Sequence, residues 1–155
     1  MGLRDGWVQI QLVYMSTQHL PVDPYFPVPA PPGQDDLPYD DGEPMETPKH
    51  RQQMSLLIET LQAHLHDRPD VFIGGNMGVY YSTAQVKNND FRAPDFFVAF
   101  DVVQDRERKS WVVWEEDGRT PDVVIELLSE TTENVDRGRK MQIYARAMRV
   151  AEYYL

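Results

Sequence analysis

Two short apolar runs constrain this sequence most, because each has a carboxylate where a strand would be buried. The run at 96–103 directly follows Asp95, and the run at 123–128 contains Glu126. Apolar runs of this length, bounded by proline and polar residues, predict buried strands. A carboxylate in such a place is costly unless a positive group meets it, and one divalent metal ion can satisfy two carboxylates together. The pattern therefore indicates a metal site at Asp95 and Glu126, with Lys140 as the nearby cation.

Each of these three charged residues also has a purely structural explanation. Asp95 could be a turn residue after a proline. Glu126 could form an ion pair with Lys140 or Arg92. Lys140 could pair with Asp136, four residues earlier on the same helix. Each explanation is credible alone, but the three residues in this order favour a functional site.

The composition narrows the classes of protein to which the chain can belong. Its 155 residues, 41% of them hydrophobic, predict one domain with a real core. It has no cysteine, which excludes disulfides, thiolate nucleophiles and Cys-based zinc sites and fits the cytoplasm. No apolar run approaches the length of a membrane span, and Gln9 and Gln11 interrupt the only such stretch near the start. We therefore expect neither a membrane segment nor a signal peptide.

The charge is strongly acidic but unevenly distributed. A formal net charge of −10 argues against a protein that coats nucleic acid by charge alone. Residues 34–48 carry six acids and no Lys or Arg. Basic residues gather instead on the last predicted helix: Arg137, Arg139, Lys140, Arg146 and Arg149. This basic face could contact phosphates, although a solvated helix surface is the simpler interpretation.

Proline spacing divides the chain into an arm and a folded region. Six prolines lie between positions 21 and 32, and such spacing favours extended polyproline II over a strand. We assign 1–36 to a proline-rich N-terminal arm or linker and 37–155 to the folded domain.

Within 37–155, the pattern predicts two long helices and several short strands. The first helix begins at Thr47 and Pro48, with His50 at the N-terminal end of its apolar stripe. The second runs from about 132 to 150 and places Lys140 and Tyr144 on one face. Strands are predicted at 71–73, 79–81, 96–103, 111–114 and 123–128, and another begins near the last residues.

Four motifs in this order resemble the Uma-type family of bacterial endonucleases. They are Arg-x-Pro-Asp at 92–95, Pro-Asp-Val-Val-Ile-Glu-Leu-Leu-Ser at 121–129, Asp-x-x-x-Lys-x-x-x-Tyr at 136–144 and Glu-Tyr-Tyr at 152–154. The family is a domain-of-unknown-function group of the restriction-endonuclease-like PD-(D/E)xK superfamily. The resemblance implies an α/β (α+β) restriction-endonuclease-like core, a mixed β-sheet flanked by α-helices. It also implies that members of the family continue past the Glu-Tyr-Tyr motif with further strands, so the domain at 37–155 is expected to lack its last strands.

The resemblance also assigns roles within the site. Asp95 and Glu126 match the two metal-binding acids, with the backbone carbonyl of Leu127 as a further ligand to Mg²⁺ or Mn²⁺. Leu128 occupies the usual place of the superfamily's lysine, and Lys140 on the following helix is the matching residue. Candidate accessory residues are His50, Tyr144 and Asp122, although turn chemistry at the start of a strand explains Asp122 better.

The leading hypothesis is a metal-dependent endonuclease that hydrolyses phosphodiester bonds in nucleic acid, with DNA as the expected substrate. The two carboxylates would hold the metal, and the lysine would assist the attacking water. A homodimer is expected of an enzyme that cuts both strands. The alternatives are a catalytically inactive interaction module that keeps the nuclease fold, or a fragment without a competent fold.

Overall fold

The computed structural model describes residues 29–39, 47–87, 92–129 and 132–155. All the elements described below lie in one compact unit, residues 31–155. Of the arm predicted at 1–36, residues 1–28 lie outside the described part, so this boundary stays a prediction.

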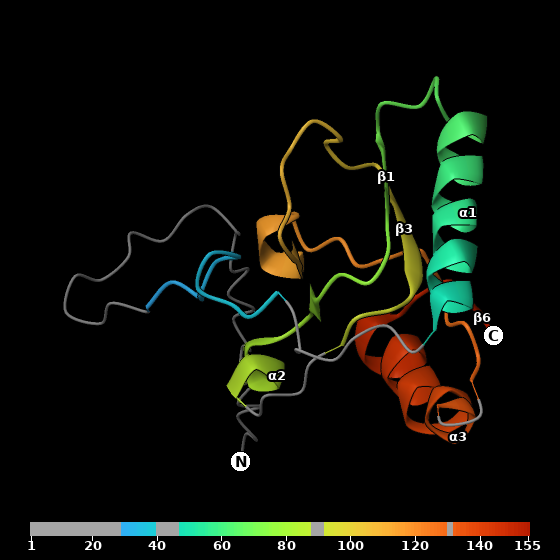
Figure 1. Cartoon of the computed structure of the whole chain (residues 1–155). Coiled ribbons are helices and arrows are strands. Elements are labelled where there is room, and N and C mark those ends of the chain that lie inside the picture. The colour runs from blue at the N-terminus through green and yellow to red at the C-terminus, as the bar shows by residue number, and fades with distance from the viewer. Residues whose placement is uncertain (1–28, 40–46, 88–91, 130–131) are drawn as a thin grey trace, which may run out of the picture. The chain divides into compact units, whose positions relative to one another are not determined.

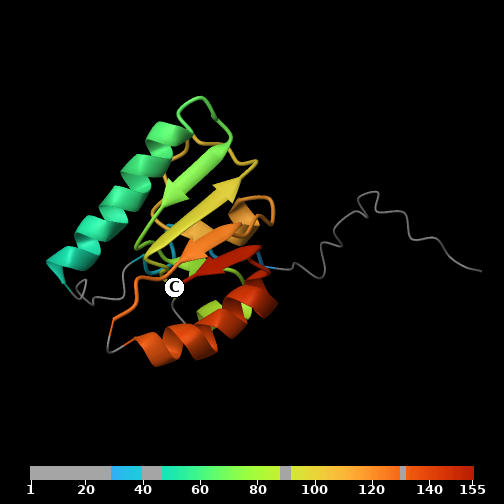
Figure 2. The ribbon, with the colours of Figure 1, turned by 90° about the vertical axis from the view of Figure 1, so that its right-hand side faces the viewer.

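A four-stranded mixed sheet forms the centre of the unit at 31–155. Its strands are β1 (Val71–Gly74), β3 (Phe96–Phe100), β5 (Val123–Ile125) and β6 (Glu152–Tyr154), in the order β1-β3-β5-β6. The pairs β1–β3 and β3–β5 are antiparallel, whereas β5 and β6 are parallel (Figure 2). A parallel pair needs a crossover connection. The helical segment at 133–148 supplies it.

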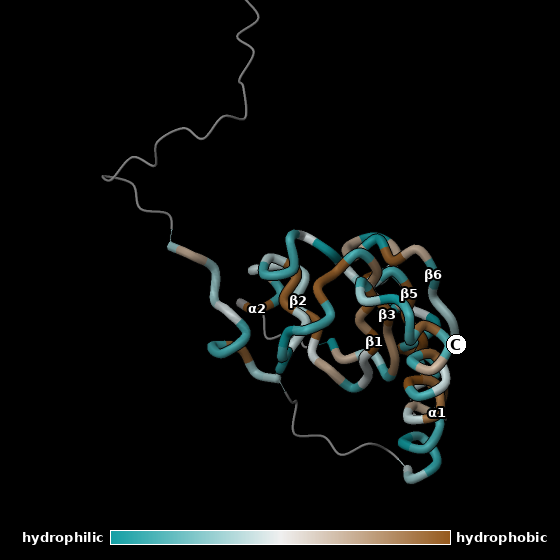
Figure 3. Tube along the Cα trace, turned by 90° about the horizontal axis from the view of Figure 1, so that it is seen from above, coloured by the Kyte–Doolittle hydropathy of each residue, from teal (hydrophilic) through white to brown (hydrophobic). Residues whose placement is uncertain are grey.

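Helix α1 (Pro48–His64) covers one face of this sheet (Figures 1 and 2). It begins as predicted, because the Thr47 side chain accepts a hydrogen bond from the backbone N–H of His50 and Pro48 takes the first helical position. Its apolar stripe packs against β1 and β3, with Leu57, Ile58, Leu61 and Leu65 contacting the cluster of Val71, Phe96 and Val98. In Figure 3, α1 alternates between hydrophobic and hydrophilic segments, as expected of a helix buried along one side.

The crossover helix packs on the opposite face of the sheet from α1, because its buried side chains contact Phe97 and Ala99 whereas the apolar stripe of α1 contacts Phe96 and Val98. It consists of α3 (Glu133–Val135) followed by two π-helical segments, Asp136–Lys140 and Ile143–Met148. Tyr144 and Met148 are buried against Phe97, Ala99 and Val124 in the main hydrophobic core. The expected mixed sheet flanked by helices is therefore confirmed.

A smaller parallel pair, β2 (Val79–Tyr80) and β4 (Trp111–Val112), lies beside the main sheet. The strand predicted at 111–114 is shorter, because Val113–Glu115 turns into a 3₁₀ helix. The short helix α2 (Thr83–Lys87) was not predicted. The Gln85 side chain holds its start by accepting from Tyr81 N and donating to Val79 O.

Two other predicted strands end early for identifiable reasons. The run at 96–103 leaves the sheet after Phe100, because Asp101 adopts a left-handed backbone conformation with φ of 56°. The run at 123–128 leaves after Ile125, where the N–H of Leu127 turns to the Asp95 side chain. The second departure matters because it occurs at the predicted site.

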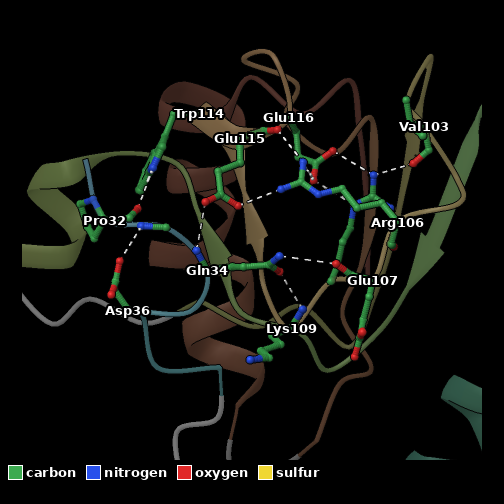
Figure 4. Close-up of polar contacts among 12 residues, drawn as sticks. Pro32, Gln34, Asp36, Val103, Arg106, Glu107, Lys109, Trp114, Glu115 and Glu116 are labelled. Atoms are coloured by element: carbon green, nitrogen blue, oxygen red, sulfur yellow. Dashed lines mark hydrogen bonds and ion pairs between the residues drawn. The ribbon is translucent and has the colours of Figure 1, made fainter. Parts of the chain in front are cut away.

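The segment at 31–39 is fastened to the body of the unit by polar contacts (Figure 4). The Gln34 N–H donates to Glu115 Oε1 over 3.2 Å, its side-chain oxygen accepts from Lys109 N over 3.0 Å, and the Trp114 indole N–H donates to Pro32 O over 2.9 Å. Leu37 is buried with Tyr80 and Val112. The part of the polypeptide just before the predicted domain boundary therefore packs onto the folded unit.

Candidate functional site

The sheet register brings the two predicted metal-binding acids together. Phe96 on β3 pairs with Ile125 on β5 in antiparallel register. One step further along this ladder, Asp95 faces Glu126. Two acids that are 31 positions apart in sequence thus meet where β3 begins and β5 ends.

Glu126 is buried and has two partners on the crossover helix. Its residue is 1% exposed. The Tyr144 hydroxyl donates to Oε1 over 2.7 Å, and the Lys140 ammonium lies 3.3 Å from Oε2. The ion pair between Glu126 and Lys140, which the sequence offered as a structural explanation, is therefore present alongside the predicted site geometry.

The buried environment of Glu126 disfavours its charged form. Burial raises the pKa of Glu126 to about 7, and the carboxylates of Asp95 and Asp136 push in the same direction. Lys140 and the Tyr144 hydroxyl oppose this shift but do not cancel it. A carboxyl group whose charged form is short of positive charge is suited to receive a cation.

Lys140 lies between two buried carboxylates. Its ammonium is 2.7 Å from Asp136 Oδ1 and 3.3 Å from Glu126 Oε2, and its side chain is 24% exposed. Burial alone would lower the pKa of Lys140, but the attraction of Glu126 and Asp136 outweighs it and the pKa is raised. At neutral pH this side chain is therefore a cation directed toward Glu126.

Asp95 and His50 hold the two peptide groups on either side of the Leu127 Cα. Asp95 Oδ2 accepts from the Leu127 N–H over 2.8 Å, and His50 Nε2 lies 2.5 Å from the Leu127 carbonyl oxygen. The carbonyl predicted as a metal ligand thus already accepts from His50, but a carbonyl oxygen has two lone pairs, so a second contact remains geometrically possible. His50 also ties the first turn of α1 to the end of β5.

Gly75 allows the chain to pass close behind Asp95. A Cβ atom at this position would come within 2.4 Å of the Asp95 carbonyl oxygen and 3.0 Å of Met54 Cγ. Only a residue without a side chain fits there. The close approach fixes the backbone from which the Asp95 carboxylate projects.

Asp122 lies at the other end of β5 from Glu126. Its Oδ2 accepts from Phe100 N over 2.8 Å, and its carbonyl accepts from Glu152 N over 3.0 Å. These contacts belong to the start of the strand, which favours the turn interpretation over an accessory role in the site.

Asp136 also belongs to the cluster around Glu126 and Lys140, although the sequence had suggested only its ion pair with Lys140. It is 1% exposed, and its backbone carbonyl accepts from the Tyr153 hydroxyl over 3.0 Å. The signal that could have identified it is its period-four spacing with Lys140 and Tyr144, which predicts a common face directed at the sheet.

The donor set fits a magnesium-type ion rather than a closed metal cage. Across the ranges that the structure describes, no group of three or more His, Cys, Asp and Glu side chains is arranged to hold a metal. Asp95 and Glu126 offer two carboxylates, and Mg²⁺ typically takes one or two carboxylates and completes its shell with water and substrate phosphate. The incompletely balanced charge at Glu126 agrees with such a cation.

A mixed sheet between helices, with paired acids at the junction of two central strands, is the restriction-endonuclease-like arrangement. The Uma2 family model, described as "Putative restriction endonuclease", matches residues 23–155. The chain therefore belongs to the Uma2 family, as its motifs predicted. No curated protein and no solved structure matches the chain. None of the helices in the described part of the chain is long and apolar enough to cross a membrane.

Proposed function

We propose that this protein is a metal-dependent endonuclease that hydrolyses phosphodiester bonds in DNA. The observation that carries the proposal is the convergence of three charged groups: Asp95 and Glu126 from adjacent strands, and Lys140 from the crossover helix. Membership of the Uma2 family supports a nuclease activity. The cofactor, the substrate and the residue roles are our proposal.

In this mechanism, Asp95 and Glu126 hold Mg²⁺ or Mn²⁺, with the Leu127 carbonyl as a further ligand. The bound ion supplies charge stabilisation on the phosphoryl oxygens and an activated water. Lys140 orients the water or neutralises the negative charge that develops on the phosphate. Tyr144 fixes one oxygen of Glu126 and leaves the other toward Lys140.

His50 is proposed as an accessory residue. Its contact with the Leu127 carbonyl holds the peptide group between Leu127 and Leu128 in one orientation. The preceding peptide group donates the Leu127 N–H to Asp95, so both peptide groups of Leu127 are fixed before any ligand arrives. Such preorganisation is what a metal site requires of the chain that surrounds its ligands.

Exposed arginines on the crossover helix support nucleic acid as the partner. Arg137, Arg139 and Arg146 are exposed on the element that carries Lys140. Between Arg137 and Glu152 the chain contains no acid, although the whole chain has a net charge of −10. We propose that this face contacts phosphates, that the enzyme works as a homodimer so that both strands are cut, and that it acts in the cytoplasm.

Calorimetric titration with Mn²⁺ tests the metal site without needing a substrate. Wild type is expected to bind Mn²⁺, and Glu126→Gln, which keeps the shape of the side chain but removes its charge, is expected to lose binding. The matched control is Glu133→Gln, which removes an exposed acid from the crossover helix and should leave binding unchanged. Equal binding by wild type and Glu126→Gln would refute the site.

Cleavage of supercoiled plasmid DNA with Mg²⁺ then tests the activity itself. Glu126→Gln should abolish cleavage, whereas Glu133→Gln should cut like wild type. Unchanged cleavage by Glu126→Gln would end the assignment. A folded wild type that binds no Mn²⁺ would instead favour the inactive interaction module, a function with which the acidic net charge agrees.

A further inference from the structure

The crossover helix directs a row of four side chains, spaced four residues apart, toward the sheet. Positions 136, 140, 144 and 148 are Asp, Lys, Tyr and Met. Asp136, Tyr144 and Met148 are almost completely buried. Lys140 is largely buried between the carboxylates of Asp136 and Glu126.

Side chains four residues apart lie on the same face of a helix. An ideal α-helix rotates by about 100° per residue, so each step of four residues overshoots a full turn by about 40°. The segments Asp136–Lys140 and Ile143–Met148 are π-helical, and their wider turn offsets this rotation. An acid, a lysine and a tyrosine therefore face the same part of the sheet.

Within this row, Lys140 contacts Asp136 more closely than Glu126. The ammonium lies 2.7 Å from Asp136 Oδ1 but 3.3 Å from Glu126 Oε2. A lysine ammonium sits on a flexible four-carbon stem and needs a fixed partner to occupy one position. Asp136 is itself fixed, because the Tyr153 hydroxyl on β6 donates to its backbone carbonyl over 3.0 Å.

We propose that Asp136 is a positioning residue that holds the Lys140 ammonium toward Glu126. Its contact with the ammonium is the shorter of the two, which leaves the looser contact with Glu126 free to adjust when a cation and a phosphate arrive. Asp136 touches neither the proposed metal nor the substrate. Its effect on catalysis rests on the proposed function, whereas its hold on Lys140 is a property of the protein alone.

Chemical labelling of Lys140 tests this hold without any substrate. The metal-free protein is treated with an amine-acetylating reagent, and the modification of Lys140 is followed by mass spectrometry. Asp136→Asn should be labelled about tenfold faster than wild type, because a charge-assisted contact is lost while the shape is kept. Glu133→Gln removes the equivalent acid from the exposed pair Glu133–Arg137 on the same helix and should not change the rate. An unchanged rate in Asp136→Asn would overturn the proposal.

Circular dichroism melts first establish that Asp136→Asn folds cooperatively. If it does not, Tyr153→Phe replaces it in the labelling experiment. That variant loosens the turn that carries Asp136 without altering its carboxylate. It should also label faster than wild type, by a smaller factor, and a rate equal to that of wild type would count against the proposal.

Cleavage kinetics separate positioning from a general structural role. With plasmid DNA and Mn²⁺, Asp136→Asn should lower kcat about tenfold with little change in KM, and Lys140→Met should lower it about a hundredfold. Asp136→Asn in the Lys140→Met background should cost nothing further, because its effect passes through the lysine. Additive losses in the double variant would refute the positioning role.

Two remaining outcomes are informative in different ways. If Asp136→Asn lost Mn²⁺ affinity as Glu126→Gln is expected to, Asp136 would be a metal ligand and the positioning role would be wrong. If wild type failed to cut DNA while labelling still accelerated in Asp136→Asn, the hold on Lys140 would stand and the proposed nuclease function would fall.

Discussion

Two buried acid–base groups in this protein look alike in composition but differ in how well their charges are balanced. In one, Glu116 receives two guanidinium hydrogen bonds of 2.9 Å from Arg108, and Arg106 lies 3.3 Å from the same carboxylate. In the other, Glu126 meets a single ammonium at 3.3 Å, which it shares with Asp136.

The Arg108–Glu116 pair has the features of a structural contact. The Arg108 guanidinium also lies 4.9 Å from the ring centre of Phe72 and 5.1 Å from that of Trp111, so aromatic faces cover it. Its bidentate geometry is the strong form of a carboxylate contact. Because both charges of this ion pair are compensated, the pair offers no free charged group to a ligand.

The Glu126 group has the opposite character. Glu126 and Asp136 share one lysine, and burial, with a smaller contribution from the carboxylates of Asp95 and Asp136, raises the pKa of Glu126 to about 7. The comparison teaches that a buried ion pair is not by itself a sign of function. What separates the two groups is the positive charge that remains to be supplied.

The largest effect is expected when the balanced pair is broken. Arg108→Met should lower the free energy of unfolding by about 3–5 kcal/mol, because it removes both guanidinium hydrogen bonds from the buried Glu116 and leaves it only the partly exposed Arg106. Urea denaturation measures this loss. Arg106→Met is the control, since its side chain is 36% exposed and its pairs are worth about 1 kcal/mol or less. Equal losses in both variants would show that burial does not distinguish the two arginines.

In contrast to the Arg108–Glu116 pair, the ionised Glu126 should lower the free energy of unfolding of the metal-free protein. The folded pKa of about 7 lies above the ordinary value of 4.5, so between these pH values the folded state binds more protons than the unfolded state. The unfolding free energy of metal-free wild type should therefore fall as pH rises from about 4.5 to about 7, by something on the order of 3 kcal/mol.

Glu126→Gln cannot ionise and should lack this decline. The measurement is a set of urea unfolding curves from pH 4.5 to 8 with a chelator present, and the difference between the two proteins isolates Glu126 from other titrating groups. Parallel curves for wild type and Glu126→Gln would contradict the shifted pKa.

A divalent cation should stabilise the protein through the Glu126 cluster and not through the Arg108–Glu116 pair. At about 100 times its dissociation constant, Mn²⁺ should raise the unfolding free energy of wild type by about 2.7 kcal/mol. The effect should grow as pH rises through about 7, because the cation needs Glu126 ionised. Thermal melts with and without Mn²⁺ measure it. Arg106→Met should keep the full stabilisation, and its persistence in Glu126→Gln would place the cation elsewhere.

The smallest effect is expected from removing the Tyr144 hydroxyl, which donates a hydrogen bond to Glu126. Tyr144→Phe should cost about 1 kcal/mol of stability at pH 5, where Glu126 is protonated, and more at pH 8. Because this hydroxyl holds the pKa of Glu126 down, its loss should also move the pH-dependent decline to higher pH. Urea unfolding across pH measures both changes. A decline shifted to lower pH would show that the hydroxyl does not stabilise the carboxylate.

Much of the fold was predictable because local signals agreed with the final structure. The cap at Thr47, the stripe along α1 and the strands at 71–74, 96–100 and 152–154 all follow from side-chain chemistry that acts within a few residues. The facing of Asp95 and Glu126 required more. It follows from the antiparallel register of β3 and β5, which the family motifs implied but which residue spacing alone does not determine.

The features that escaped prediction depend on contacts distant in sequence. The parallel pairing of β2 with β4 joins residues 32 positions apart, with no local signal for the direction of the strands. The π-helical winding at Asp136–Lys140 likewise has no local signal in the sequence. The period-four spacing puts Asp136 and Lys140 on one face of the helix, but it does not show that Lys140 is shared between Asp136 and Glu126.

The parallel pairing of β5 with β6 has a consequence for how the proposed site is assembled during folding. The helix that bears Lys140 connects β5 to β6, and these two strands pair with each other. The helix is therefore anchored to the sheet at both of its ends. Such pairings have high contact order and form slowly, because the entropy of closing the intervening chain is lost before the contacts are gained. A nascent or partly unfolded chain would thus lack the assembled cluster of Lys140 and Glu126, and the proposed site would form only with the complete topology.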